Sequence, residues 1–147
     1  MTHIISFVGK SGSGKTTLIE KLVEHLVSTK LIIGTIKHTH HNFELDKKGK
    51  DSYRHFNAGA TSSMIISDNK IGYVSRYTDF ELLSLVKIFF SHCDIVIIEG
   101  FKNDDTDKIE VYRKDTGYEP IYKGLKNVIA IATDDNFSNI KTLDINN

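Results

Sequence analysis

The stretch "FVGKSGSGKTTLIEKL", residues 7–22, decides the fold of this chain. Three glycines and two serines fall within residues 9–14, and a lysine and two threonines follow them. The preceding residues, "HIISFVG" (3–9), are mostly β-branched and apolar, which is typical of a short buried strand. Beyond the loop, apolar residues at positions 18, 19, 22, 23, 26 and 27 have helical spacing. The sequence therefore predicts a strand, a glycine-rich loop and an amphipathic helix in direct succession.

Residues 9–16 fit the phosphate-binding P-loop pattern in full. Glycines let the backbone curl so that successive N–H groups point at one phosphate, and the start of the helix adds its positive dipole end. Lys15 would bring a full charge to the outer phosphates, and the Thr16 hydroxyl is suited to ligate Mg²⁺. We therefore predict a nucleotide site rather than a flexible turn, formed by Gly9, Lys10, Ser11, Gly12, Ser13, Gly14, Lys15, Thr16 and Thr17.

Two carboxylates bracket the later strand "DIVIIEG" (94–100), whose four consecutive aliphatic residues indicate burial on both faces. At about 3.3 Å per residue, Asp94 and Glu99 lie roughly 16 Å apart. Ligands of such sheets bind at the carboxyl ends of the strands, so only Glu99 can lie close to the phosphates. We predict that Glu99 holds the metal with Thr16, directly or through a water, or orients an attacking water. Lys15 and Glu99 are the candidate catalytic residues.

The remaining pattern alternates strands and helices, which favours an α/β fold. We expect one domain over residues 1–147, a three-layer P-loop NTPase-type domain with a mostly parallel sheet and an additional β-hairpin. The hairpin turns at Asp68-Asn69, Asp51 is suited to cap one helix, and Thr78 and Glu81 have capping-box spacing before another. Asp104, Asp105 and Asp107 are expected in a solvated loop. Further strands are predicted at 31–37, 108–113 and 127–134, and helices at 51–60 and 82–90.

A histidine-rich stretch follows the second predicted strand, on the same edge of the sheet as the P-loop. Its cations are suited to a phosphorylated second substrate, while a metal site and a merely solvated loop remain alternatives. These cations and histidines are Lys37, His38, His40, His41, Lys47, Lys48, Lys50, Arg54 and His55.

Composition excludes several other classes of protein. Lysine plus arginine equals aspartate plus glutamate at 19 each, so no nucleic-acid binding is expected. The single cysteine, Cys93, excludes an internal disulfide and a cysteine-rich zinc site. No apolar run approaches the roughly 20 residues of a membrane span, and no secretion signal is visible. We therefore expect a cytoplasmic protein with no membrane association.

Several blocks together resemble the molybdopterin-guanine dinucleotide biosynthesis protein B (MobB) family, from Ile4 to about Asp134. They are the P-loop, "GTIKHTHHNFELDKKGKDSYRHFNAGA" (34–60), "DIVIIEGFK" (94–102) and "KIEVYR" (108–113). The resemblance implies a cytoplasmic, usually dimeric protein that binds GTP with Mg²⁺ and hydrolyses it slowly. It also implies assistance to protein A, the partner enzyme that joins GMP to molybdopterin in molybdenum cofactor synthesis. Residues 37–54 would face the nucleotide or the pterin, with Lys37, His38, Asp51 and Arg54 as candidates.

The guanine-reading Asn-Lys-x-Asp motif of many GTPases is absent, so the preference for GTP rests on the resemblance. In "ATDDN" (132–136), Asp134 or Asp135 is the nearest candidate to accept from a guanine N–H, and an exposed turn is the alternative. Arginines are scarce, with no clustered lid and no obvious arginine finger, so hydrolysis should be slow. Two other functions remain open: a P-loop small-molecule kinase and a non-hydrolysing, nucleotide-dependent adaptor.

Overall fold

The structure, a computed structural model, describes residues 2–77 and 79–146. The chain divides into two compact units, one of Met1–Thr39 with Leu85–Asn147 and one of His40–Ser84. We call them the sheet unit and the hairpin unit and describe each separately. Thr78, in the expected capping box, lies outside the described residues. Within the described residues, no helix combines the length and the apolar character needed to cross a membrane.

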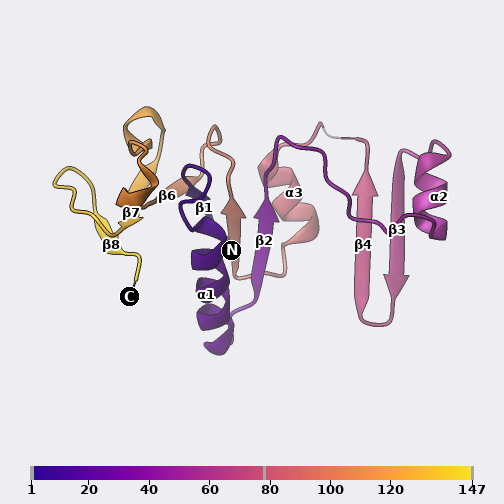
Figure 1. Cartoon of the computed structure of the whole chain (residues 1–147). Helices are drawn as coiled ribbons and strands as arrows, with labels where there is room; N and C mark the ends of the chain where they lie inside the picture. Colours follow the sequence, from indigo (N-terminus) through magenta and orange to yellow (C-terminus); the bar gives the residue numbers. More distant parts are fainter. Residues whose placement is uncertain (1, 78, 147) are drawn as a thin grey trace. The chain divides into compact units, whose positions relative to one another are not determined.

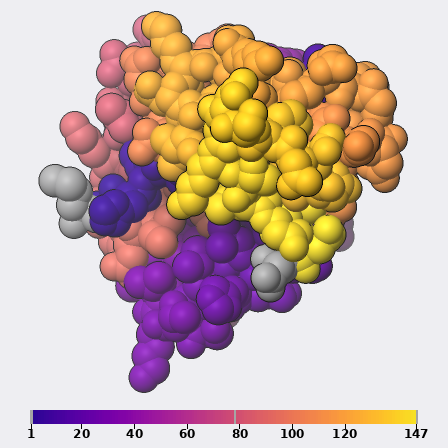
Figure 2. All heavy atoms as spheres, turned by 90° about the vertical axis from the view of Figure 1, so that its left-hand side faces the viewer, coloured from indigo at the N-terminus to yellow at the C-terminus, as the bar shows by residue number. Residues whose placement is uncertain are grey.

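The sheet unit contains a six-stranded parallel sheet in the order β2-β5-β1-β6-β7-β8 (Figure 1). The five strands predicted in this part of the chain are present, and the short β8 is an addition that the sequence did not indicate. In Figure 2 the C-terminal segment in yellow lies against the orange segment that precedes it in the chain. The strands are β1 (His3–Val8), β2 (Ile33–Lys37), β5 (Ile95–Glu99), β6 (Asp107–Tyr112), β7 (Val128–Thr133) and β8 (Thr142–Asp144).

Helix α1 (Lys15–Ser28) covers one face of this sheet. Its Ile19 joins Phe7, Ile97 and Val111 in the buried core. On β5, Val96, Ile97 and Ile98 are all at most 1% exposed, which confirms the strand covered on both faces. Helix α3 (Leu82–Phe89) ends directly before Phe90. A Cβ on Gly34 of β2 would lie only 2.4 Å from the Phe90 ring, so β2 packs closely against this residue. Two single 3₁₀ turns, Lys114–Thr116 and Tyr122–Gly124, join β6 to β7.

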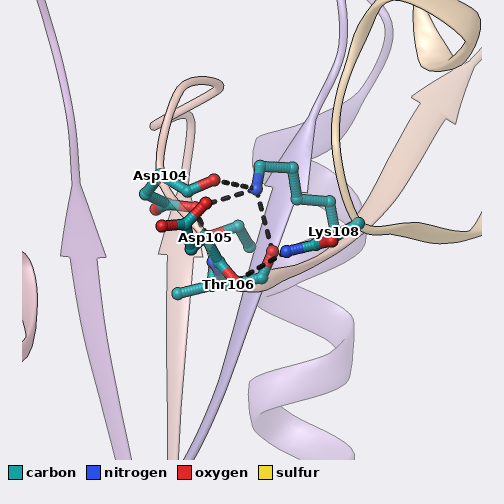
Figure 3. Close-up of polar contacts among 6 residues, drawn as sticks. Asp104, Asp105, Thr106 and Lys108 are labelled. Carbon is teal, nitrogen blue, oxygen red and sulfur yellow. Dashed lines mark hydrogen bonds and ion pairs between the residues drawn. The ribbon is translucent and has the colours of Figure 1, made fainter.

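The connection from β5 to β6 is held by a buried polar cluster rather than by a helix (Figure 3). The Lys108 side chain is fully buried, and its Nζ donates to the carbonyls of Asp104 at 2.6 Å and Thr106 at 2.8 Å. The same ammonium pairs with Asp104 Oδ1 at 2.9 Å. Thr106 Oγ1 lies 2.7 Å from the hydroxyl of Ser6 on β1. The expectation of a solvated loop is therefore wrong for Asp104, whose side chain is 8% exposed, because a buried lysine four residues later pairs with it.

The hairpin unit consists of α2 (Asp51–Asn57), β3 (Ser62–Ser67) and β4 (Lys70–Ser75). The two strands are antiparallel and turn at Asp68-Asn69 as predicted, and α2 packs against β3 (Figure 1). Arg76 ties the helix to the hairpin, since its guanidinium donates to the carbonyls of Phe56 at 2.7 Å and Ala60 at 2.6 Å. Asp51 does not cap the helix: it is the first helical residue, and Lys50 occupies the N-cap position without a side-chain hydrogen bond.

Candidate nucleotide-binding site

The loop between β1 and α1 uses its glycines for backbone conformations that other residues rarely adopt. Gly9, Gly12 and Gly14 have φ angles of 149°, 78° and 86°. At Gly9 the reason is also steric, because a Cβ would lie 2.4 Å from the Val111 carbonyl oxygen on β6. Gly14 is the left-handed N-cap residue of α1. The loop therefore curls against the sheet and delivers its backbone to the start of the helix, as phosphate binding requires.

The Lys15 side chain folds back over this loop. Its ammonium donates to the carbonyl of Lys10 at 2.6 Å and to that of Gly9 at 3.3 Å. Burial lowers the pKa of Lys15; the negative charge of Glu99 opposes that shift, and the positive charges of Lys102 and Lys37 add to it. Three ammonium groups thus act on one small region, which an anionic ligand would stabilise.

Glu99 ends β5 at the level where the neighbouring strands also end, opposite Phe7 on β1 and Lys37 on β2. Its carboxylate oxygen Oε1 accepts from the Thr16 hydroxyl at 2.9 Å and lies 3.2 Å from Lys37 Nζ. The Glu99 side chain is 17% exposed, so the contact is partly shielded from water. The predicted meeting of Thr16 and Glu99 is confirmed as geometry, and their role as metal ligands stays a prediction.

These oxygens fit Mg²⁺, which prefers hard oxygen ligands and keeps several waters or phosphate oxygens in its shell. Across residues 2–77 and 79–146, no three histidine, cysteine, aspartate or glutamate side chains gather as a metal-holding group. A magnesium ion would therefore depend on the oxygens of a bound nucleotide in addition to Thr16 and Glu99.

Asp94 lies at the other end of β5, as predicted. It precedes the strand, and its carboxylate accepts from the backbone N–H of Ile32 at 2.8 Å. The strand direction inferred from the sequence is therefore correct.

The histidine-rich stretch divides between the two units. Lys37 and His38 belong to the sheet unit, where the His38 N–H donates to the Glu99 carbonyl at 2.9 Å and its ring meets the Phe101 ring at 4.5 Å between centroids. Asp51 and Arg54 belong to the hairpin unit, where they form an exposed ion pair of 3.9 Å with each other. The contacts at Glu99 thus include Lys37 and His38 from this stretch.

Asp134 follows β7 at the same edge of the sheet, and its carboxylate has partners within the sheet unit. Oδ1 accepts from the Lys114 N–H at 3.0 Å, and Oδ2 lies 3.6 Å from Arg113. The Lys114 hydrogen bond, with a smaller contribution from Arg113, lowers the pKa of Asp134. Asp135 Oδ1 lies 3.7 Å from Lys114 Nζ. Both carboxylates therefore hold the segment that follows β6.

Arg113 is a candidate that the sequence analysis missed. Its Nε lies 3.5 Å from the position that a Cβ on Gly14 would take, so the guanidinium borders the P-loop. The signal was present but indirect: Arg113 directly follows β6, and β6 pairs with the strand that leads into the P-loop. Only the strand order makes these two segments neighbours.

A hollow of about 490 Å³ opens beside Thr16, Lys37 and Glu99, between α1 and strands β2 and β5. Its inner wall is apolar and includes Ile19, Val23 and Ile97. The site therefore has room for a second small molecule next to the predicted metal ligands.

Comparisons with known proteins agree with this architecture. A protein-family model described as "Molybdopterin guanine dinucleotide synthesis protein B" (MobB) matches residues 4–134. The chain is 36% identical over 152 residues to a molybdopterin-guanine dinucleotide biosynthesis adapter protein of Escherichia coli, covering 99% of this chain and 87% of that protein. An adapter protein of the same description from Haemophilus influenzae is 34% identical over 132 residues, covering 88% and 74% of the two chains.

Solved structures are similar as well. The chain resembles a crystal structure of molybdopterin-guanine biosynthesis protein B with a TM-score of 0.77 at 27% identity, covering 97% of this chain and 89% of the other. The crystal structure of Bacillus subtilis MobB has the same TM-score and identity, with coverage of 99% and 91%.

Proposed function

The chain belongs to the molybdopterin guanine dinucleotide synthesis protein B (MobB) family, and on that premise we propose that it is a GTP-binding accessory protein of molybdenum cofactor biosynthesis. It binds GTP with Mg²⁺, hydrolyses it slowly at most, and assists protein A, the enzyme that joins GMP to molybdopterin. We propose that the protein acts in the cytoplasm. The adapter names of the two bacterial relatives support an accessory rather than an independent role.

The observation that carries the proposal is the contact of Thr16 with Glu99 at 2.9 Å directly beside the curled P-loop. The loop N–H groups and the start of α1 bind the phosphates, and Lys15 exchanges its carbonyl contacts for phosphate oxygens. Thr16 and Glu99 would hold the Mg²⁺ ion, and Lys37 balances the charge of Glu99. Bound Mg²⁺ supplies charge neutralisation at the outer phosphates. The Arg113 guanidinium borders the loop, where Asp134 restrains it.

Slow hydrolysis follows from the state of the candidate base. The Glu99 carboxylate accepts from Thr16 and pairs with Lys37, so these contacts engage it in holding the site rather than in orienting an attacking water. Selection of guanine falls to Asp134 or Asp135, which follow β7 at the same edge of the sheet as the P-loop.

The test is calorimetric titration of the protein with GTP and with ATP in the presence of Mg²⁺. Lys15→Ala should weaken GTP binding by about 1.5–3 kcal/mol, the range for a hydrogen bond to a charged group. Lys21→Ala, on the exposed face of the same helix, is the matched control and should change nothing. Failure of the unmodified protein to bind GTP, or equal binding by Lys15→Ala, would refute the proposal.

A homodimer is also part of the proposal, and the hairpin unit supports it. Met64 and Tyr73 pair across one face of the hairpin, as do Ile66 and Ile71. Met64, Ile66 and Ile71 are 50–70% exposed. An exposed apolar strip of this kind is typical of a protein interface, and a second copy of the chain would cover it.

The second candidate function, a small-molecule kinase, is favoured by one observation: the hollow of about 490 Å³ next to Thr16 and Glu99 has room for a phosphoryl acceptor. Release of GDP or ADP that depends on an added acceptor would indicate a kinase. Stoichiometric binding of GTP without turnover, even with protein A and molybdopterin present, would instead indicate a non-hydrolysing adaptor.

A further inference from the structure

Arg113 borders the P-loop, but the proposed function gives it no contact with the ligand. It directly follows β6, and its Nε lies 3.5 Å from the position that a Cβ on Gly14 would take. Gly14 is the N-cap residue of α1, where the backbone N–H groups of the loop and the helix converge on a bound phosphate. The Arg113 guanidinium is therefore a cation beside the phosphate-binding start of the helix.

The protein itself satisfies this guanidinium poorly. The Arg113 side chain is 32% exposed, so most of it is shielded from water. Within residues 2–77 and 79–146, both polar contacts of the guanidinium involve Nη1, which lies 3.6 Å from Asp134 Oδ2 and 3.5 Å from Asn146 Oδ1. These contacts are long, and a guanidinium has five N–H donors. A ligand with several acceptor oxygens would therefore be stabilised here, and a phosphate matches the paired donors of arginine.

The order of the strands decides which phosphate Arg113 can reach. β5 and β6 pair with β1 on opposite sides, so Glu99 and Arg113 flank the P-loop from opposite sides. In the proposed function, the outer phosphates and Mg²⁺ lie beside Glu99, and the base lies near the segment that follows β7. Since β6 lies between β1 and β7, the part of the nucleotide that joins these two ends passes the end of β6. That part is the α-phosphate with its ribose.

We propose that Arg113 binds the α-phosphate of the nucleotide. The guanidinium exchanges its long contacts with Asp134 and Asn146 for two oxygens of this phosphate, while Lys15 acts on the outer phosphates. The inference rests on the proposed function, because it requires a nucleotide on the P-loop. It extends that function by adding a second cation that determines affinity, on the opposite side of the loop from the predicted metal ligands.

Two other roles for Arg113 fit the geometry less well. An arginine finger acts on the outer phosphate at which hydrolysis occurs, but Thr16 and Glu99 mark that end of the ligand on the other side of β1. A merely structural role would be the orientation of Asp134. The Lys114 N–H already fulfils that role at 3.0 Å, a shorter contact than the 3.6 Å from Arg113.

The first experiment titrates the full chain with GTP, GDP and ATP in the presence of Mg²⁺ by calorimetry. Arg113→Ala should weaken the binding of all three roughly tenfold to a hundredfold and by similar factors, because each carries the α-phosphate. Arg113→Lys keeps the charge but loses the paired donors, so it should recover part of the affinity. Lys126→Ala is the matched control and should change nothing, because Lys126 is exposed and precedes β7 at the opposite edge of the sheet.

The second experiment locates the contact by ³¹P NMR of bound GDP, whose α- and β-phosphorus atoms give separate signals. Compared with the unmodified protein, Arg113→Lys should move the α-phosphorus signal and leave the β-phosphorus signal nearly in place. Lys15→Ala should do the reverse, because its ammonium acts on the outer phosphates. A residue that only supports the fold would not move one phosphorus signal selectively.

Similar losses of GTP, GDP and ATP affinity, together with a selective shift of the α-phosphorus signal, support the proposal. It is overturned if Arg113→Ala binds GDP as tightly as the unmodified protein, or if Arg113→Lys moves only the β-phosphorus signal. A changed ratio of GTP to ATP affinity with an unmoved α-phosphorus signal also overturns it, because Arg113 would then act through Asp134. In each of these cases nucleotide binding by the unmodified protein leaves the proposed function standing, whereas its failure to bind any nucleotide refutes both.

Discussion

Replacement of Lys108 by methionine should be among the most destabilising single changes on the sheet unit. Lys108 is fully buried, and methionine preserves most of its apolar stem while removing the ammonium group. The change leaves the Asp104 carboxylate, 8% exposed, without its counter-charge, and it removes the donor from the Asp104 and Thr106 carbonyls. Asp104 Oδ2 already has no hydrogen-bond partner among the described residues, so only the two Thr106 donors to Oδ1 remain.

Breaking a buried ion pair in this way costs about 3–5 kcal/mol, because one charge stays buried without compensation. That is a large share of the roughly 5–15 kcal/mol by which a domain is usually stable. Lys114→Met is the matched control: its pair with Asp135 is 3.7 Å long with side chains 72% and 30% exposed, so its loss should cost under about 1 kcal/mol.

Urea unfolding followed by circular dichroism measures both free energies from the midpoint and the slope. The double variant Lys108→Met/Asp104→Asn should recover part of the loss, because it also removes the unpaired charge while Asn keeps an oxygen for Thr106. If Lys108→Met lowers the free energy of unfolding no more than Lys114→Met does, the buried cluster does not stabilise the β5–β6 connection.

Three further outcomes follow from the geometry. Glu99→Gln should lower Mg²⁺-dependent GTP turnover by roughly 100-fold while changing GTP affinity far less. Asp94→Asn, at the opposite end of the strand, should alter neither quantity. The reverse pattern in steady-state kinetics would contradict the assignment of Glu99 to the site. Burial raises the pKa of the Glu110 carboxyl, and hydrogen bonds from the Ile121 and Tyr122 N–H groups oppose that shift. The contribution of Glu110 to stability is therefore fully present below the ordinary carboxyl pKa and is lost as pH rises through the raised value. In urea titrations, Glu110→Gln should therefore flatten the decline of unfolding free energy as pH rises above the ordinary carboxyl pKa. It should do so at some cost in stability, because one of two backbone N–H groups loses its acceptor; an unchanged slope would show that Glu110 does not carry the decline. Ile66→Lys, opposite Ile71 on the exposed hairpin face, should shift a dimer to monomer in light scattering, and a dimer that persists would place the interface elsewhere.

The P-loop could be predicted almost completely, since its function depends on consecutive residues. Glycines that adopt positive φ, a lysine and a threonine at fixed spacing are sufficient to specify the curl and the helix start. Glu99 was also predictable, because four aliphatic residues indicate a central strand and the carboxyl end of a parallel strand lies at the ligand edge. The contact of Glu99 with Thr16 at 2.9 Å agrees with that reasoning.

The burial of Asp104 could not be predicted from local sequence. Three aspartates within four residues are typical of a solvated turn, and the lysine that buries one of them carries no distinctive local pattern. The loop must cross β1 to reach β6, and only this crossing places Thr106 against Ser6 and shields Lys108 from water. Arg113 is a similar case, because the order β1-β6-β7 brings it to the P-loop and to Asp134.

The amino-acid order alone thus determined the P-loop, the direction of the central strand and the family of the chain, because each of these depends on short-range spacing along the backbone. Tertiary structure alone decided which charges lie in water and which lie buried, and which loop ends become neighbours at the ligand edge. Those outcomes depend on strand order and on burial, and both arise only when segments distant in the chain pack together.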